Sequence, residues 1–250
     1  MHSLRNARLF WPTLAALAGL AVLIGLGTWQ MERKRWKEGL LAQIAARVHA
    51  EPVPVAAALE RAGGKGEAVP EYTHVSVTGR FNHAKERYLY APTPAGLGWH
   101  VYTPLEIAGS KVIWINRGLV PDVRKAPATR HKGQVEGGVE VRGLVRHPSL
   151  PGSFAARNDP DHNLWYWPDL GAMTVSAFPN ASPDALPQVL PFVIEADAGP
   201  APPGGLPRGG VTRLSLPNRH LEYALTWYGL AATLVGVYLA FVISRLRFVP

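Results

Sequence analysis

The sequence of 250 residues contains no cysteine, and only 18% of its residues are charged. Without cysteine the chain cannot form disulfides, hold an iron–sulfur cluster or a thiolate zinc site, or use a thiol nucleophile. Lys and Arg outnumber Asp and Glu by 26 to 18, a net charge of +8. Such an excess is compatible with nucleic acid, anionic lipid or an acidic substrate as a partner. The segments that lack charge are more informative.

Sequence motifs that carry catalysis are also missing. The chain has no G-x-S-x-G, G-x-x-x-x-G-K-(S/T), G-x-G-x-x-G or H-E-x-x-H, and no two of its nine histidines have the three- or four-residue spacing of a helical metal site. Asp159, Asp161 and Asp169 could form an acidic cluster, but the run 158–160, Asn-Asp-Pro, favours a turn. Basic residues are scattered among apolar stretches, which argues against nucleic-acid binding. We therefore expect a protein that is not an enzyme.

Two long segments carry no charge, residues 9–31 and 223–244. A membrane-spanning helix needs about 20 apolar residues, and both segments have Trp or Tyr near their ends, as interfacial aromatics do. The apolar part of a cleaved signal peptide is shorter and ends in small residues, whereas the first segment ends in Thr28, Trp29 and Gln30. We predict two transmembrane helices. Because little sequence precedes Leu9, we expect a multi-pass protein of the bacterial inner membrane.

Two spans place a short N-terminus, 1–8, and a tail, 245–250, on one side and the insert 32–222 on the other. Arg5, Arg8, Arg245 and Arg247 would hold both termini in the cytoplasm under the positive-inside rule. The inner flanks carry the opposing set Arg33, Lys34, Arg35, Lys37, Arg213 and Arg219. Charge alone therefore leaves the orientation open, since the rule is weakest for long translocated domains.

The insert begins as a helix and continues as strands. Leu40, Ile44 and Val48 recur every four residues and predict that the first helix extends as an amphipathic stalk. A short helix is expected at 55–61 after Pro54, and another at 169–178 capped by Asp169. The run 199–210 contains four prolines and five glycines, a loop or linker composition.

A shared pattern, V-x-V-x-G-x-(F/V), occurs at 75–81 and 139–145 and predicts two half-buried strands with a bend or bulge at Gly79 and Gly143. Further strands are expected at 87–91, 99–107, 112–119 and 189–196. The fold class is therefore a membrane protein in which two transmembrane helices flank a mostly antiparallel β (α+β) domain.

One constellation stands at the start of the second apolar segment. If a helix begins near Asn218, a natural N-cap, five residues share one face: His220, Tyr223, Ala224, Trp227 and Ala231. The imidazole could ligate the iron of a macrocycle, the aromatic and small residues could cover the ring, and Arg219 could pair with a propionate. Alternatively, His220 is an interfacial residue and Tyr223 and Trp227 are belt aromatics; from the residues alone this is the commoner case.

The chain resembles the surfeit locus protein family, membrane-anchored assembly factors of haem–copper cytochrome c oxidase. The resemblance runs almost end to end and rests on six motifs in order: LGTWQMERKRWK at 26–37, GRF at 79–81, TPL at 103–105, NRGLVP at 116–121, NDPDHNLWYWPDL at 158–170 and NRHLEYALTWYGLA at 218–231. Leu119 departs from the family, which usually has Trp there.

This resemblance implies cytoplasmic termini, a periplasmic β domain, and delivery of haem a to oxidase subunit I or its stabilisation there. It also implies oxidase subunit I and haem a synthase as partners, and the two predicted spans add membrane lipid. Its haem-linked histidine corresponds to His220, so we expect transient haem a binding by His220 with Arg219, Tyr223 and Trp227. Other motif residues are candidates for fold or partner contacts only: Trp29, Gln30, Arg33, Asn116, Arg117, Gly118, Asn158, Asp159, Trp165 and Tyr166. Of these, Gly118 resembles a turn glycine, and Trp165 and Tyr166 could anchor the β domain to a membrane or partner.

An alternative remains a scaffold that binds oxidase subunits without holding haem. Five glycines in the apolar segments could let a partner helix approach, or could pack the two spans together: Gly19, Gly25, Gly27, Gly229 and Gly236.

Overall fold

The computed structural model describes residues 2–63, 67–94, 96–212 and 217–247, which form two compact units. The first, here called the helix pair, comprises residues 1–43 and 215–250, and the second, the β domain, comprises residues 44–214. The main helices are α1 (His2–Val48) and α4 (His220–Arg247). As the stalk prediction required, α1 continues well beyond its apolar segment.

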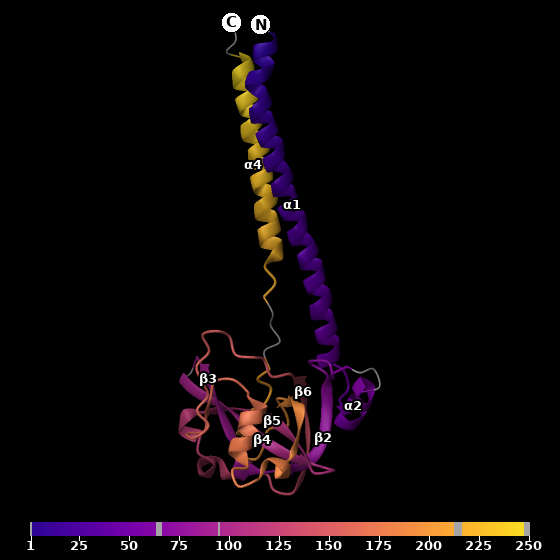
Figure 1. Cartoon of the computed structure of the whole chain (residues 1–250), viewed down its shortest axis with the longest axis vertical. Coiled ribbons are helices and arrows are strands. Elements are labelled where there is room, and N and C mark those ends of the chain that lie inside the picture. Colours follow the sequence, from indigo (N-terminus) through magenta and orange to yellow (C-terminus); the bar gives the residue numbers. More distant parts are fainter. Residues whose placement is uncertain (1, 64–66, 95, 213–216, 248–250) are drawn as a thin grey trace. The chain divides into compact units, whose positions relative to one another are not determined.

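The helix pair is antiparallel, as Figure 1 shows. Contacts between the helices join Thr13 to Tyr238 and Thr28 to Tyr228. Both helices contain a segment long and apolar enough to cross a membrane, and they expose large apolar side chains such as Trp11, Leu17 and Val237. A helix in the core of a soluble domain would bury these side chains, so lipid is the solvent that suits this surface. The chain is therefore consistent with a membrane protein.

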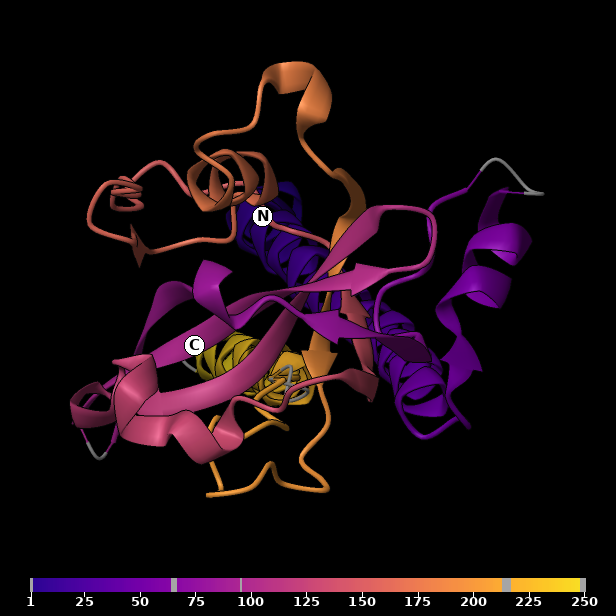
Figure 2. The same cartoon turned by 90° about the horizontal axis from the view of Figure 1, so that it is seen from below.

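The β domain contains one mixed, mostly antiparallel sheet that curls strongly (Figure 2). Its strands are β1 (Val53–Pro54), β2 (His74–Phe81), β3 (Arg87–Thr93), β4 (Gly96–Ile107), β5 (Lys111–Pro121), β6 (Gly138–Arg146), β7 (Leu164–Trp165) and β8 (Gln188–Ala196). The order is β1-β2-β6-β8-β5-β4-β3-β7, and β2 also pairs with β4. This additional pairing closes β2, β6, β8, β5 and β4 into a barrel.

Side chains from all five barrel strands form one hydrophobic core, together with α2 (Val55–Gly63). Residues 113–115 of β5 show how alternate side chains of a strand lie on opposite faces of the sheet. Ile113 and Ile115 belong to this core, whereas Trp114 packs on the other face against Met173 of α3 (Leu170–Ala177) and donates a hydrogen bond to Thr174. All three are fully buried, as a buried central strand requires.

Most predicted elements of the insert are confirmed, within a few residues of the expected limits. Asp169 caps α3 by accepting a hydrogen bond from the amide of Ala172. Four short 3₁₀ helices complete the β domain: η1 (His83–Lys85), η2 (Asp122–Arg124), η3 (Pro127–Gly133) and η4 (Pro183–Ala185).

Several local predictions are wrong. The bulge predicted as one alternative at Gly79 and Gly143 is wrong, because the β2–β6 ladder passes through both without a register shift. Each glycine instead lets a neighbouring strand approach closely. Gly118 is not in a turn: it lies inside β5 with φ +109°, where Arg117 and Gly118 together face Val101 in a β-bulge.

The Pro- and Gly-rich run 199–210 is a loop, as predicted, but it packs on the β domain. Arg208 and Leu119 exchange two backbone hydrogen bonds of 2.9 Å, and the amide of Gly210 donates to the carbonyl of Ala196. The loop is therefore part of the folded domain. Its glycines and prolines suit close backbone contacts with the β domain, and the segment is not a free linker.

Candidate functional site

His220 is the first residue of α4, and a hydrogen bond to α1 fixes its imidazole ring. Its Nδ1 lies 2.8 Å from Oε1 of Gln30. An amide oxygen can only accept, so Nδ1 donates to it; in the neutral ring Nε2 then keeps its lone pair. Within the described residues no hydrogen bond engages Nε2. This arrangement, in which one ring nitrogen is held and the other is available, is typical of metal-ligating histidines.

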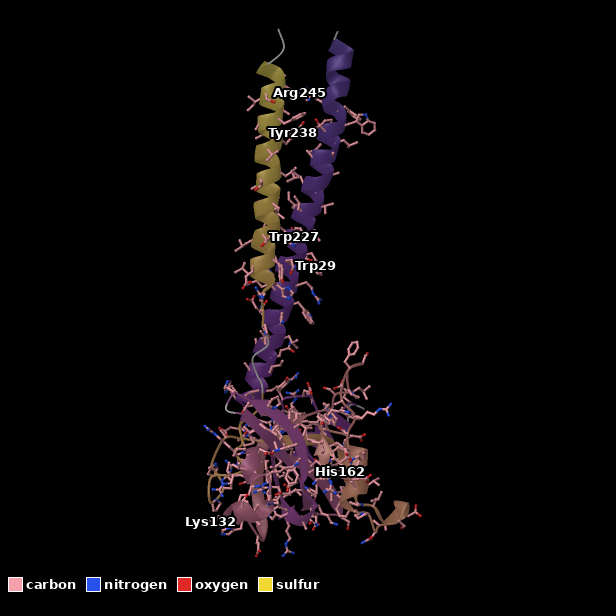
Figure 3. All side chains as sticks on the ribbon, turned by 90° about the vertical axis from the view of Figure 1, so that its left-hand side faces the viewer. Trp29, Lys132, His162, Trp227, Tyr238 and Arg245 are labelled. Atoms are coloured by element: carbon pink, nitrogen blue, oxygen red, sulfur yellow. The ribbon has the colours of Figure 1, made fainter. Side chains whose placement is uncertain are left out.

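The residues predicted to share one face with His220 differ in how far they are buried. Ala224 and Ala231 are buried, Trp227 is half-buried, and Tyr223 is 52% exposed. Figure 3 shows Trp227 at the same level of the helix pair as Trp29 on α1. The small residues of the stripe are therefore covered within the helix pair, and Tyr223 and Trp227 are the members that remain accessible beside His220.

Arg219 precedes the helix and is exposed. Its Nε donates to Oε2 of Glu222 at 2.9 Å. An exposed ion pair of this kind contributes little to stability, so a ligand carboxylate can replace Glu222 at small cost.

Asn218 does not have the predicted capping role. The helix begins at His220, and Oδ1 of Asn218 is buried without a hydrogen-bond partner among the described residues. The backbone carbonyl of Arg219 instead accepts the first helical hydrogen bond, from the amide of Tyr223 at 3.3 Å.

These residues fit an iron macrocycle in part. The oriented imidazole fits an axial ligand, and Arg219 fits a carboxylate. The predicted cover fits less well, because Ala224 and Ala231 are already buried and leave Tyr223 and Trp227 as the ring-covering groups. Elsewhere in the described residues, no group of three or more His, Asp or Glu side chains could hold a metal ion.

The motif residues of the β domain have mainly structural contacts. Oδ1 of Asn116 accepts from the amide of Gly118, and the amide side chain of Asn158 bonds the backbone of Tyr166 and Trp167. Trp165 is fully buried, so its predicted role as a surface anchor is wrong. Tyr166, 39% exposed, could still contact a membrane or partner.

A buried ionic cluster was not predicted from the sequence. The Glu86 carboxylate is 3% exposed and lies 2.5 Å from Arg130 and 3.3 Å from Arg117. Burial alone would raise the pKa of Glu86, but contacts with His83 and Arg130 and the charges of Arg130 and Arg117 outweigh it and lower the pKa to about 2. The cluster holds η1, β5 and η3 together and performs no evident chemistry.

Comparison with known proteins supports the family resemblance. The model of the SURF1 family matches residues 17–232. A "SURF1-like protein" of Monosiga brevicollis is 37% identical, with 94% of this chain and 88% of the relative aligned. "Surfeit locus protein 1" of Mus musculus is 39% identical over 85% of this chain and 69% of the relative. "Surfeit locus protein 1" of Homo sapiens is 38% identical over 83% of this chain and 70% of the relative. The chain therefore belongs to the SURF1 family.

Proposed function

We propose that this chain is a non-enzymatic assembly factor of haem–copper cytochrome c oxidase, which binds haem a through His220 and passes it to subunit I. The observation that carries the proposal is the hydrogen bond between His220 and Gln30, because it leaves Nε2 available for iron. Membership of the SURF1 family supports the oxidase as the destination. Haem a synthase, oxidase subunit I and membrane lipid are the proposed partners.

Each residue has a distinct role in this proposal. When bound, the haem supplies the iron centre of the oxidase. Gln30 would hold the proton on Nδ1 of His220, and Nε2 would be the iron ligand. Arg219, now paired with Glu222, would bind a propionate. Tyr223 and Trp227 would shield the ring from water.

Release follows from the exposure of this site. A single protein ligand at a half-buried helix end holds a macrocycle less firmly than a closed site with two ligands. A carrier has to bind its cargo only moderately, because a subunit with higher affinity then draws the cargo away. The proposed site meets that requirement.

The membrane position is part of the proposal. Because the helix pair is antiparallel, two spans put both termini on one side, proposed as the cytoplasm, and the β domain in the periplasm. Monosiga brevicollis, Mus musculus and Homo sapiens are eukaryotes, so these relatives lend no support to a bacterial inner membrane. The same topology applies to whichever membrane contains the oxidase.

Replacing His220 by Ala is expected to abolish haem a binding while the protein stays in the membrane. The chain is purified in detergent from cells that make haem a, and reduced-minus-oxidised spectra give haem per protein. His162→Ala is the matched control, because His162 is an exposed histidine of the β domain. Unchanged haem content in His220→Ala would exclude the assigned ligand.

Replacing Gln30 by Ala is expected to lower haem affinity by about 10-fold or more, the usual effect of losing a partner that orients a metal ligand. Haem titration of the detergent-purified protein measures this, and Gln30→Glu, which keeps an acceptor for Nδ1–H, should retain binding. If Gln30→Ala binds haem as tightly as the unaltered chain, Gln30 does not position His220.

The glycines of the helix pair favour a second candidate, the scaffold. A Cβ on Gly27 would collide with the ring of Tyr228 and one on Gly19 would contact Leu234, so these two pack α1 against α4. A Cβ on Gly25, Gly229 or Gly236 would meet no atom within 4 Å beyond its own stretch of helix, so these three could admit a partner helix. Absence of haem from the purified protein, with oxidase subunits copurifying, would favour this function over haem binding.

A further inference from the structure

Arg87, the first residue of β3, is a buried cation without an anionic partner. It is 8% exposed. Its Nε donates to the hydroxyl of Ser176 at 2.8 Å, and Nη1 donates to the carbonyls of Lys85 and Glu86 at 3.2 and 2.9 Å. In the part of the chain that the structure describes, no carboxylate forms an ion pair with it, and Nη2 makes no hydrogen bond. Burial accordingly lowers the pKa of Arg87.

The charges buried around Arg87 do not balance. Among the described residues, the buried charged side chains are one carboxylate, Glu86, and three guanidinium groups, Arg87, Arg117 and Arg130. Arg117 and Arg130 share Glu86, so the buried set carries two positive charges in excess. A buried charge is costly unless a counter-charge accompanies it. This excess of buried positive charge favours an anion at this place over a cation.

A cavity of about 410 Å³, wide open to solvent, lies beside Arg87. Its other polar lining residues are His83, Glu86, Tyr88, Gln134, Asn163 and the exposed His131. The Glu86 carboxylate is already paired with Arg117 and Arg130. The His131 ring has no hydrogen-bond partner among the described residues, so it can donate to a ligand. An oxyanion replaces several waters of about 30 Å³ each, so the cavity has room for a phosphate or carboxylate group and part of the molecule that bears it.

We propose that this cavity binds a small oxyanion, a phosphate or carboxylate group, with Nη2 of Arg87 as its main donor and His131 at the mouth. A charge-assisted hydrogen bond to an oxyanion is among the stronger contacts available to a guanidinium. The site lies in the β domain, is built from residues other than those proposed for haem, and does not depend on haem binding.

The test is calorimetric titration of the full chain in detergent with sodium phosphate and with sodium succinate, at constant ionic strength. We expect saturable binding of at least one anion, and Arg87→Met should weaken it by about 10-fold or more. Arg142→Met, which removes an exposed arginine, is the control for general charge.

Binding of phosphate alone would identify a phosphate-bearing ligand, and binding of succinate alone a carboxylate; either result supports the site. The His131→Gln variant covers the case in which Arg87→Met fails to fold, because His131 is exposed, and it should weaken binding by a few-fold. The proposal is overturned if the unaltered chain binds neither anion, or if Arg142→Met weakens binding as much as Arg87→Met and His131→Gln do. Anion binding should persist in His220→Ala, which separates this site from the proposed haem site.

Discussion

Replacing Glu86 by Gln should destabilise the β domain by about 3–5 kcal/mol, the usual cost of removing one partner from a buried ion pair. The reason is that Arg117 and Arg130 both depend on this carboxylate and are themselves 7% and 5% exposed. A neutral amide keeps the volume of the side chain but leaves both guanidinium groups buried without a counter-charge. Thermal or denaturant unfolding of the detergent-solubilised protein, monitored by circular dichroism, measures the change.

The pH dependence of the same variant gives an independent check. The folded pKa of Glu86 is about 2, below its ordinary value of 4.5. A depressed carboxyl pKa means that the stabilisation is complete above about pH 4.5 and is lost as the pH falls toward 2. The difference in unfolding free energy between the two chains should therefore be largest near neutral pH and shrink in acid.

The control for this prediction is Glu140→Gln, which removes an exposed carboxylate paired with Arg142 on β6. An exposed pair contributes roughly 0–1 kcal/mol, so the control should unfold nearly like the unaltered chain. If Glu86→Gln were no less stable than Glu140→Gln, the ionic cluster would not hold the domain together.

Replacing Gly118 by Ala should cost about 3 kcal/mol or more. Its φ of +109° is a conformation that residues with a Cβ rarely adopt, and a Cβ there would point directly at the backbone carbonyl of Arg208. The loop 199–210 would have to move away and break its hydrogen bonds with Leu119. Unfolding measurements give the loss of stability, and faster proteolysis at Arg208 should report the displaced loop.

Gly152→Ala is the matched control for Gly118→Ala. Gly152 has an ordinary φ and no atom lies within 4 Å of the position that a Cβ would take, so adding one carbon should change stability by less than about 1 kcal/mol. Equal stability of the two alanine variants would contradict the role assigned to the close approach between β5 and the loop.

Periodicity predicted most strands and helices, because a strand or helix with one buried face carries a regular apolar pattern in its own sequence. The two V-x-V-x-G-x-(F/V) segments are β2 and β6, and they pair directly. The closure of the barrel was not predictable, because the β2–β4 pairing depends on how far the whole sheet curls. The local position of Gly118 also depends on a loop that contacts it from about 90 residues away in the sequence.

Contacts distant in sequence explain the rest of what was missed. The composition of the loop 199–210 indicates a linker and does not reveal its bonds to β5. Glu86 gives no periodic signal, and its partners come from η1, β5 and η3. At the candidate site, the spacing placed His220 and Trp227 on one face, but it could not identify Gln30, 190 residues earlier, as the partner that orients the imidazole.

Rescue by exogenous imidazole tests the central claim most directly. The His220→Gly variant, purified in detergent from cells that make haem a, is titrated with imidazole while its reduced-minus-oxidised spectrum is recorded. If Nε2 of His220 is the iron ligand, the variant should lack haem without imidazole and regain it, with a histidine-like spectrum, as imidazole is added. Full haem content in His220→Gly without imidazole would contradict the proposal.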